Sequence, residues 1–83
     1  MPTVAIVAGV LIVLYFNDHD PAHFHAICGR DKMLVRISDL AVIRGDLPRD
    51  KRRAVLEWAA AKQADLALAW VRVRQDENPG RLD

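Results

Sequence analysis

The three histidines of this chain lie within one seven-residue stretch, at His19, His23 and His25. Two carboxylates, Asp18 and Asp20, flank the first of them. Imidazole changes its charge near neutral pH and is also the commonest metal ligand among side chains. This stretch is therefore the candidate site for chemistry, either metal binding or acid–base catalysis.

If residues 23–28 form a strand, His23 and His25 project to the same face, because side chains two residues apart share a face. Phe24 then points to the opposite face, into the core, and His19 reaches over from the preceding turn. Such a trio can hold a divalent transition metal such as zinc or nickel and leave one coordination position open. A carboxylate, from Asp18 or Asp20, serves as a fourth ligand or fixes an imidazole tautomer. The predicted metal ligands are His19, His23, His25 and Asp18.

Two alternatives use the same residues. In a metal-free site of ribonuclease type, His23 and His25 act as acid and base, with His19 beside them, on a ribose hydroxyl and a leaving oxygen. In a structural role, the imidazoles hydrogen-bond backbone groups that the proline-containing loop leaves unpaired. The spacing of the histidines does not choose between metal site, catalytic site and structural role.

A basic run begins the segment that we expect to be helical. Cations are disfavoured at a helix N-terminus, so an anion nearby would stabilise them. We therefore consider a phosphate, or an acidic partner protein, as the ligand of this run. A solvated face, partly neutralised by Asp50 and Glu57, is the simpler interpretation. The run comprises Arg49, Lys51, Arg52 and Arg53.

The elements that must position these residues are predicted to form an α+β domain. β-Branched and apolar runs alternate with tight turn signals, which is typical of an antiparallel sheet of three or four strands. After Gly45 the apolar spacing becomes helical, with Pro48 at a favourable first position. An unbroken helix over 48–74 would be about 40 Å long, against a domain about 30 Å across, so we expect a break. The expected strands are about 4–8, 10–16, 23–28, 32–37 and 42–44, and the helical segments about 48–61 and 64–74.

Length and composition set further limits. The chain has 83 residues, 52% of them hydrophobic, and a net charge of +1. We expect one domain over 1–75 and a flexible polar tail over 76–83. The apolar stretch 4–16 is shorter than the roughly 20 residues of a membrane-spanning helix, so no membrane partner is expected. The single cysteine, Cys28, fits a reducing, cytoplasmic compartment.

Several segments are similar to a known family. The stretch Tyr15-Phe16-Asn17-Asp18-His19-x-Pro21-x-His23-Phe24-His25-Ala26, then Gly45-Asp46-Leu47-Pro48 and Val55-Leu56-Glu57-Trp58, resembles the small bacterial family catalogued as domain of unknown function 4160. The resemblance covers about 9–70. Ala22, Ile27, Cys28 and Lys62 depart from the family pattern, where a proline, an acid, an aromatic residue and a histidine are common.

The resemblance also implies a biological setting. Members of the family are often encoded beside a second small protein of the domain of unknown function 2442 family, in an arrangement regarded as toxin–antitoxin-like. We therefore expect a component of such a two-gene module that acts through its histidine cluster, with a cognate partner protein and RNA as candidate partners. The alternatives are a metal-binding module and a non-enzymatic interaction module whose strand 10–16 and basic helix form a partner surface. A homodimer is one candidate assembly of the latter.

Overall fold

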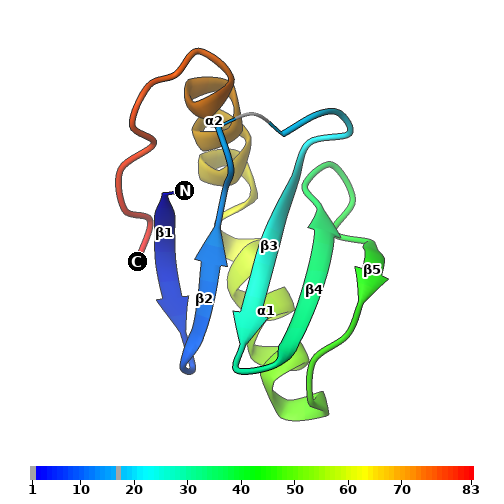
Figure 1. Ribbon diagram of the computed structural model, residues 1–83. Coiled ribbons are helices and arrows are strands. Elements are labelled where there is room, and N and C mark those ends of the chain that lie inside the picture. Colours follow the sequence, from blue (N-terminus) through cyan, green and yellow to red (C-terminus); the bar gives the residue numbers. More distant parts are fainter. Residues whose placement is uncertain (1, 17) are drawn as a thin grey trace.

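The computed structural model describes residues 2–16 and 18–83, so Met1 and Asn17, the latter within the histidine motif, lie outside the described residues. Five strands form one antiparallel sheet in the order β1-β2-β3-β4-β5, and two helices follow (Figure 1). The α+β prediction is confirmed, with five strands rather than three or four. The elements are β1 (Thr3–Val7), β2 (Val10–Val13), β3 (His23–Cys28), β4 (Asp31–Arg36), β5 (Val42–Gly45), α1 (Arg49–Ala61) and α2 (Gln63–Arg74).

The connections between strands differ sharply in length. Val7 pairs with Val10 and Cys28 pairs with Asp31, so two-residue loops join β1 to β2 and β3 to β4. Gly9 and Gly29 supply the positive φ angles that such tight loops favour. The link between β2 and β3 is instead the long loop 14–22, because β2 ends at Val13 rather than continuing to Phe16. This loop carries the first half of the histidine motif over the end of the sheet.

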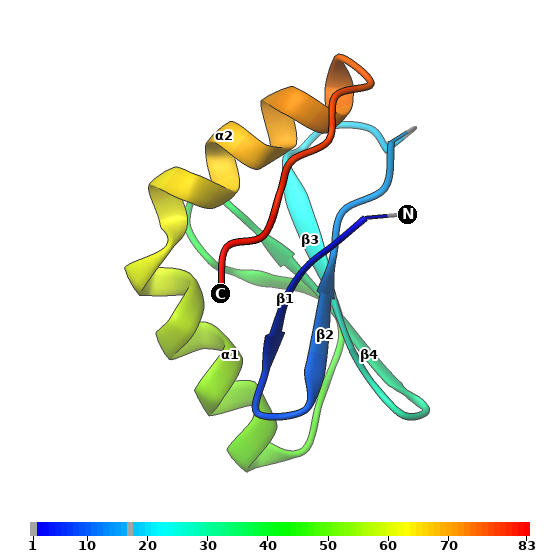
Figure 2. The same ribbon diagram turned by 90° about the vertical axis from the view of Figure 1, so that its left-hand side faces the viewer.

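The helices cover one face of the sheet, and the core lies between these two layers (Figure 2). Phe24 of β3 is fully buried, and its ring meets Trp58 of α1 edge-on at 6.4 Å between centroids. Val55 of α1 and Leu66 of α2 are buried in the same core. Burying each such side chain stabilises the fold by about 1.5–3 kcal/mol. Because Phe24 points into this core, the strand directs its neighbour His25 to the other face.

The helical region breaks at Lys62, as the length argument predicted. Lys62 has φ −116° and ψ 15°, which interrupts the helical path between α1 and α2. The side chain of Gln63 then donates hydrogen bonds to the backbone carbonyls of Ile37 and Ser38, at 2.7 and 3.0 Å. The domain is 33 Å along its longest axis, too short for the unbroken helix considered above. The break directs α2 across the end of the sheet that carries the loop 14–22.

The last residues run beside the edge of β1 (Figures 1 and 2). The Leu82 N–H donates to the Val4 carbonyl at 2.7 Å, and the Ile6 N–H donates to the Asp83 carboxylate at 2.9 Å. Pro79 is fully buried. The flexibility expected of 76–83 stays a prediction. Within the described residues, neither helix has the length and apolar character needed to span a bilayer.

Candidate metal centre

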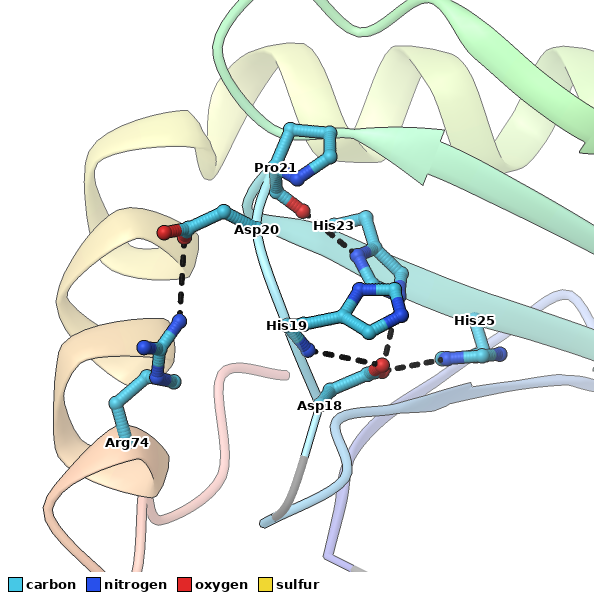
Figure 3. A network of polar contacts seen from close by, with 7 residues as sticks. All are labelled: Asp18, His19, Asp20, Pro21, His23, His25 and Arg74. Carbon is cyan, nitrogen blue, oxygen red and sulfur yellow. Dashed lines mark hydrogen bonds and ion pairs between the residues drawn. The ribbon is translucent and has the colours of Figure 1, made fainter.

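The centre of the site is the Asp18 carboxylate, which bridges two imidazoles (Figure 3). Its Oδ2 lies 2.9 Å from Nε2 of His23 and 3.0 Å from Nε2 of His25. The two histidines come from the start of β3, on the same face, as their spacing predicted. Asp18 comes from the loop 14–22. The three potential ligand atoms all lie within 4.8 Å of one another.

The second nitrogen of His23 is held by the backbone. Its Nδ1 lies 2.8 Å from the Pro21 carbonyl oxygen, which can only accept, so Nδ1 carries the hydrogen. A neutral ring then has its lone pair on Nε2, facing the Asp18 carboxylate. Two acceptors at 2.9 Å repel each other unless a cation, either a proton or a metal ion, lies between them. A metal-binding histidine typically donates its other N–H to a carbonyl or carboxylate in this way.

Aromatic side chains pack against both imidazoles. The Trp70 ring of α2 lies 5.3 Å from the His23 ring, and His23 is only 4% exposed. Tyr15 meets His25 edge-on at 4.5 Å between centroids. These contacts restrict the rotation of both rings. The site is therefore built on packed groups from β3, α2 and the loop, rather than on mobile surface side chains.

The Asp18 carboxyl has a pKa below its ordinary value of 3.8. Burial alone raises this pKa, but the hydrogen bond with His25, the coulombic attraction to His23 and the His19 N–H together outweigh burial. The carboxyl group is therefore ionised at neutral pH. A metal ligand requires this ionised form.

The three groups open onto a pocket of about 470 Å³. The same pocket is also lined by Leu34 of β4 and by Ile43 and Arg44 of β5. This volume is within the usual range of small-molecule sites. Coordination positions that the protein leaves open would therefore be accessible from the pocket.

His19 and Asp20 are placed differently from the expected ligand set. His19 is exposed and lines the pocket, but its ring nitrogens are not part of the ligand cluster. Its contribution is a backbone N–H that donates to Asp18 at 3.3 Å. Asp20 turns away from the cluster and pairs with Arg74 of α2 at 3.2 Å (Figure 3). Of the predicted ligands, the structure thus brings together Asp18, His23 and His25.

The basic run lies at the other end of β3 from the histidines. Lys51 donates to the Ala8 carbonyl at 2.7 Å, which places the start of α1 beside the β1–β2 turn. Leu11 pairs with Ile27 and Val13 with His25, so that turn lies at the Cys28 end of β3. Two members of the run have acidic neighbours, with Asp46 at 3.0 Å from Arg52 and Glu57 at 3.4 Å from Arg53. Arg49, Lys51, Arg52 and Arg53 therefore do not line the histidine pocket.

Sequence reasoning did not find the groups that surround the ligands. The contact of Trp70 with His23 had no sequence signal. The hydrogen bond from His23 to the Pro21 carbonyl is of the kind that the structural alternative anticipated, in which imidazoles bond backbone groups of the loop. Arg44 lies far along the chain from the motif, and only the pairing of β3 with β4 and of β4 with β5 brings it to the pocket. No pattern within one element could have indicated it.

Comparisons with other proteins give a family but no function. Searches of curated proteins and of solved structures gave no match. A family model described as domain of unknown function (DUF4160) matches residues 9–71, which include every residue of the Asp18, His23 and His25 cluster. Since the match covers well over half of the 83 residues, the chain belongs to this DUF4160 family.

Proposed function

We propose that this protein binds a divalent transition metal through Asp18, His23 and His25. The observation that carries the proposal is the convergence of their three ligand atoms within 4.8 Å, with the His23 ring already oriented by the Pro21 carbonyl. Two imidazoles and one carboxylate are a ligand set used by catalytic zinc sites and by iron(II) sites. A bound metal ion would take the place between Nε2 of His23 and the Asp18 carboxylate that a proton otherwise occupies.

Metal-free acid–base chemistry has weaker support. Both nitrogens of His23 already have partners, since Nδ1 donates to Pro21 and Nε2 faces Asp18. No nitrogen of this ring is left to exchange a proton with a substrate. The basic run, for which a phosphate was considered beside the simpler interpretation of a solvated face, lies at the opposite end of β3. The toxin–antitoxin-like module and its partner protein therefore remain expectations that derive from the family resemblance. RNA cleavage remains an expectation that derives from the histidines.

The metal proposal is tested by elemental analysis and titration of protein purified without a polyhistidine tag. We expect one zinc per chain, with nickel binding at the same site. His25→Ala is the preferred ligand variant because His25 is less buried than His23 and its loss disturbs packing less. His19→Ala is the matched control, since it removes an exposed imidazole from the same loop but outside the cluster.

The expected result is a loss of zinc affinity of about 100-fold or more in His25→Ala and Asp18→Asn, which exceeds the 10–100-fold effect typical of groups around the ligands. His19→Ala should bind as the parent protein does. Circular dichroism checks that each variant is folded. The proposal is overturned if zinc, nickel, copper and iron(II) all fail to bind stoichiometrically, or if His19→Ala abolishes binding while His25→Ala does not.

A further inference from the structure

One row of paired residues crosses the sheet from the candidate metal centre to Arg44. His25 of β3 pairs with Leu34 of β4, and Leu34 pairs with Arg44 of β5. Residues that are directly opposite on neighbouring strands present their side chains to the same face. Adjacent strands lie about 4.8 Å apart, so the flexible Arg44 side chain starts two strands from His25. Its presence in the pocket lining agrees with this register.

Arg44 has an exposed, positively charged side chain with no assigned structural role. In the described part of the chain, five other arginines have a carboxylate oxygen within 4.0 Å, whereas Arg44 has none within that distance. A guanidinium is suited to bidentate recognition of a carboxylate or phosphate. Its position in the lining of the same pocket as the metal ligands therefore indicates an anionic ligand.

The charge of the pocket depends on the metal. Without a metal, the proton that lies between His23 and the Asp18 carboxylate only balances the negative charge of Asp18, so the cluster offers an anion no net positive charge. A divalent cation bound to Asp18 and two neutral imidazoles would leave a net positive centre, because the carboxylate supplies only one negative charge. The metal and Arg44 would then act on an anion from two sides of the same pocket. Anion binding should for this reason require the metal, and the coupling between the two ligands is reciprocal.

The residues that line the pocket also indicate the size and the chemical character of the ligand. Leu34 and Ile43 line it beside Arg44, and Ile43 is 40% exposed. A volume of about 470 Å³ exceeds the space that a bare inorganic ion would fill. Apolar side chains next to the guanidinium of Arg44 favour a ligand that carries both an apolar group and an anionic group.

We propose that the metal-loaded pocket binds a small organic carboxylate, whose carboxylate group is held between the metal and the guanidinium of Arg44 and whose apolar part lies against Leu34 and Ile43. This inference rests on the proposed metal site. It adds to that proposal the class of ligand, the residue that selects it and the order in which metal and ligand bind.

Calorimetry with benzoate as the probe tests the inference. We expect benzoate to bind the zinc-loaded protein and to bind the metal-free protein at least tenfold more weakly. Arg44→Gln should weaken benzoate binding by about tenfold or more, the value of a charge-assisted hydrogen bond, and should leave zinc binding unchanged. Arg49→Gln is the matched control because Arg49 is exposed at the start of α1, outside the pocket lining.

Two further probes separate the contributions of charge and apolar contact. Benzamide keeps the ring but lacks the negative charge, and acetate keeps the charge but lacks the ring, so both should bind more weakly than benzoate. If zinc binds but the protein does not prefer benzoate over benzamide, or if Arg44→Gln has no effect on benzoate binding, the carboxylate inference is overturned. The proposed metal site is not affected by that result. If zinc itself does not bind, the proposed function and this inference fail together.

Discussion

The Trp70 ring packs against the His23 ring at 5.3 Å between centroids, with a 49° angle between their planes. Arg74, one turn further along α2, lies over the same indole at 5.8 Å and pairs with Asp20 of the loop. The second helix therefore contacts both the strand and the loop that supply the candidate ligands. The break at Lys62 sets the direction of α2 and so contributes to the geometry of the site.

Trp70 should act as a fluorescent reporter of the metal. The chain has two tryptophans, so Trp58→Phe leaves Trp70 as the only one. Copper(II) or nickel(II) at the cluster should strongly quench Trp70, because these open-shell ions quench at short range. We expect weaker quenching in Trp70→Phe, where Trp58 packs against Phe24 in the core. Equal quenching in the two variants would place the bound ion elsewhere.

Zinc should stabilise the folded protein, because the ligand atoms converge only in the native state. At a free zinc concentration of 100 times the dissociation constant, the gain is about 2.7 kcal/mol. For a domain of this size that corresponds to a rise in melting temperature of roughly 10–20 °C. Thermal unfolding followed by circular dichroism measures this rise, and excess EDTA should reverse it. Asp18→Asn should show little or no rise with zinc, and a rise equal to that of the parent would exclude Asp18 as a ligand.

Gly45→Ala should destabilise the edge of the sheet that carries Arg44. Gly45 has φ +71°, and a Cβ added there would clash with the Lys32 carbonyl oxygen. Gly29→Ala is the matched comparison, because Gly29 has φ +59° but nothing within 4 Å of an added Cβ. Strain at positive φ costs about 1–3 kcal/mol in both variants, and the clash adds to it only at Gly45. Urea unfolding that gives equal losses for the two variants would contradict this account.

The turn between β4 and β5 should remain formed well into the acid range. Asp39 accepts two hydrogen bonds from Arg36, at 2.9 and 2.7 Å, and one from the Ala41 N–H at 3.1 Å. The Arg36 bonds lead the effects that lower the pKa of Asp39 from 3.8 to about 2. Since the pKa is depressed on folding, the contribution of Asp39 to stability is complete above about pH 4 and is lost as the pH falls through 2. An NMR titration of its carboxyl carbon measures the midpoint, and a value near 3.8 would show that these bonds do not persist in solution.

Much of the fold follows from local pattern. Runs of β-branched and apolar residues, glycines at tight turns and the change to helical spacing after Gly45 are properties of short segments, so they predicted the strands and the helices. The break near Lys62 was instead predicted from the length that an unbroken helix over 48–74 would have. The facing pair His23 and His25 was predictable for the same reason, because alternation along one strand decides it. The end of β2 was harder to predict. Residues 14–16 are apolar enough to continue the strand, yet in the structure they belong to the loop.

The composition of the site depends on contacts between distant segments. The path of the loop 14–22 brings Asp18 to the imidazoles, while the His19 ring stays outside the ligand cluster. Strand register across β3, β4 and β5 brings Arg44 to the pocket, and packing of α2 brings Trp70 to His23. The sequence alone determined which side chains were available and how neighbours alternate. Only tertiary packing decided which of them meet, because loop path, register and helix direction are set by the whole buried core.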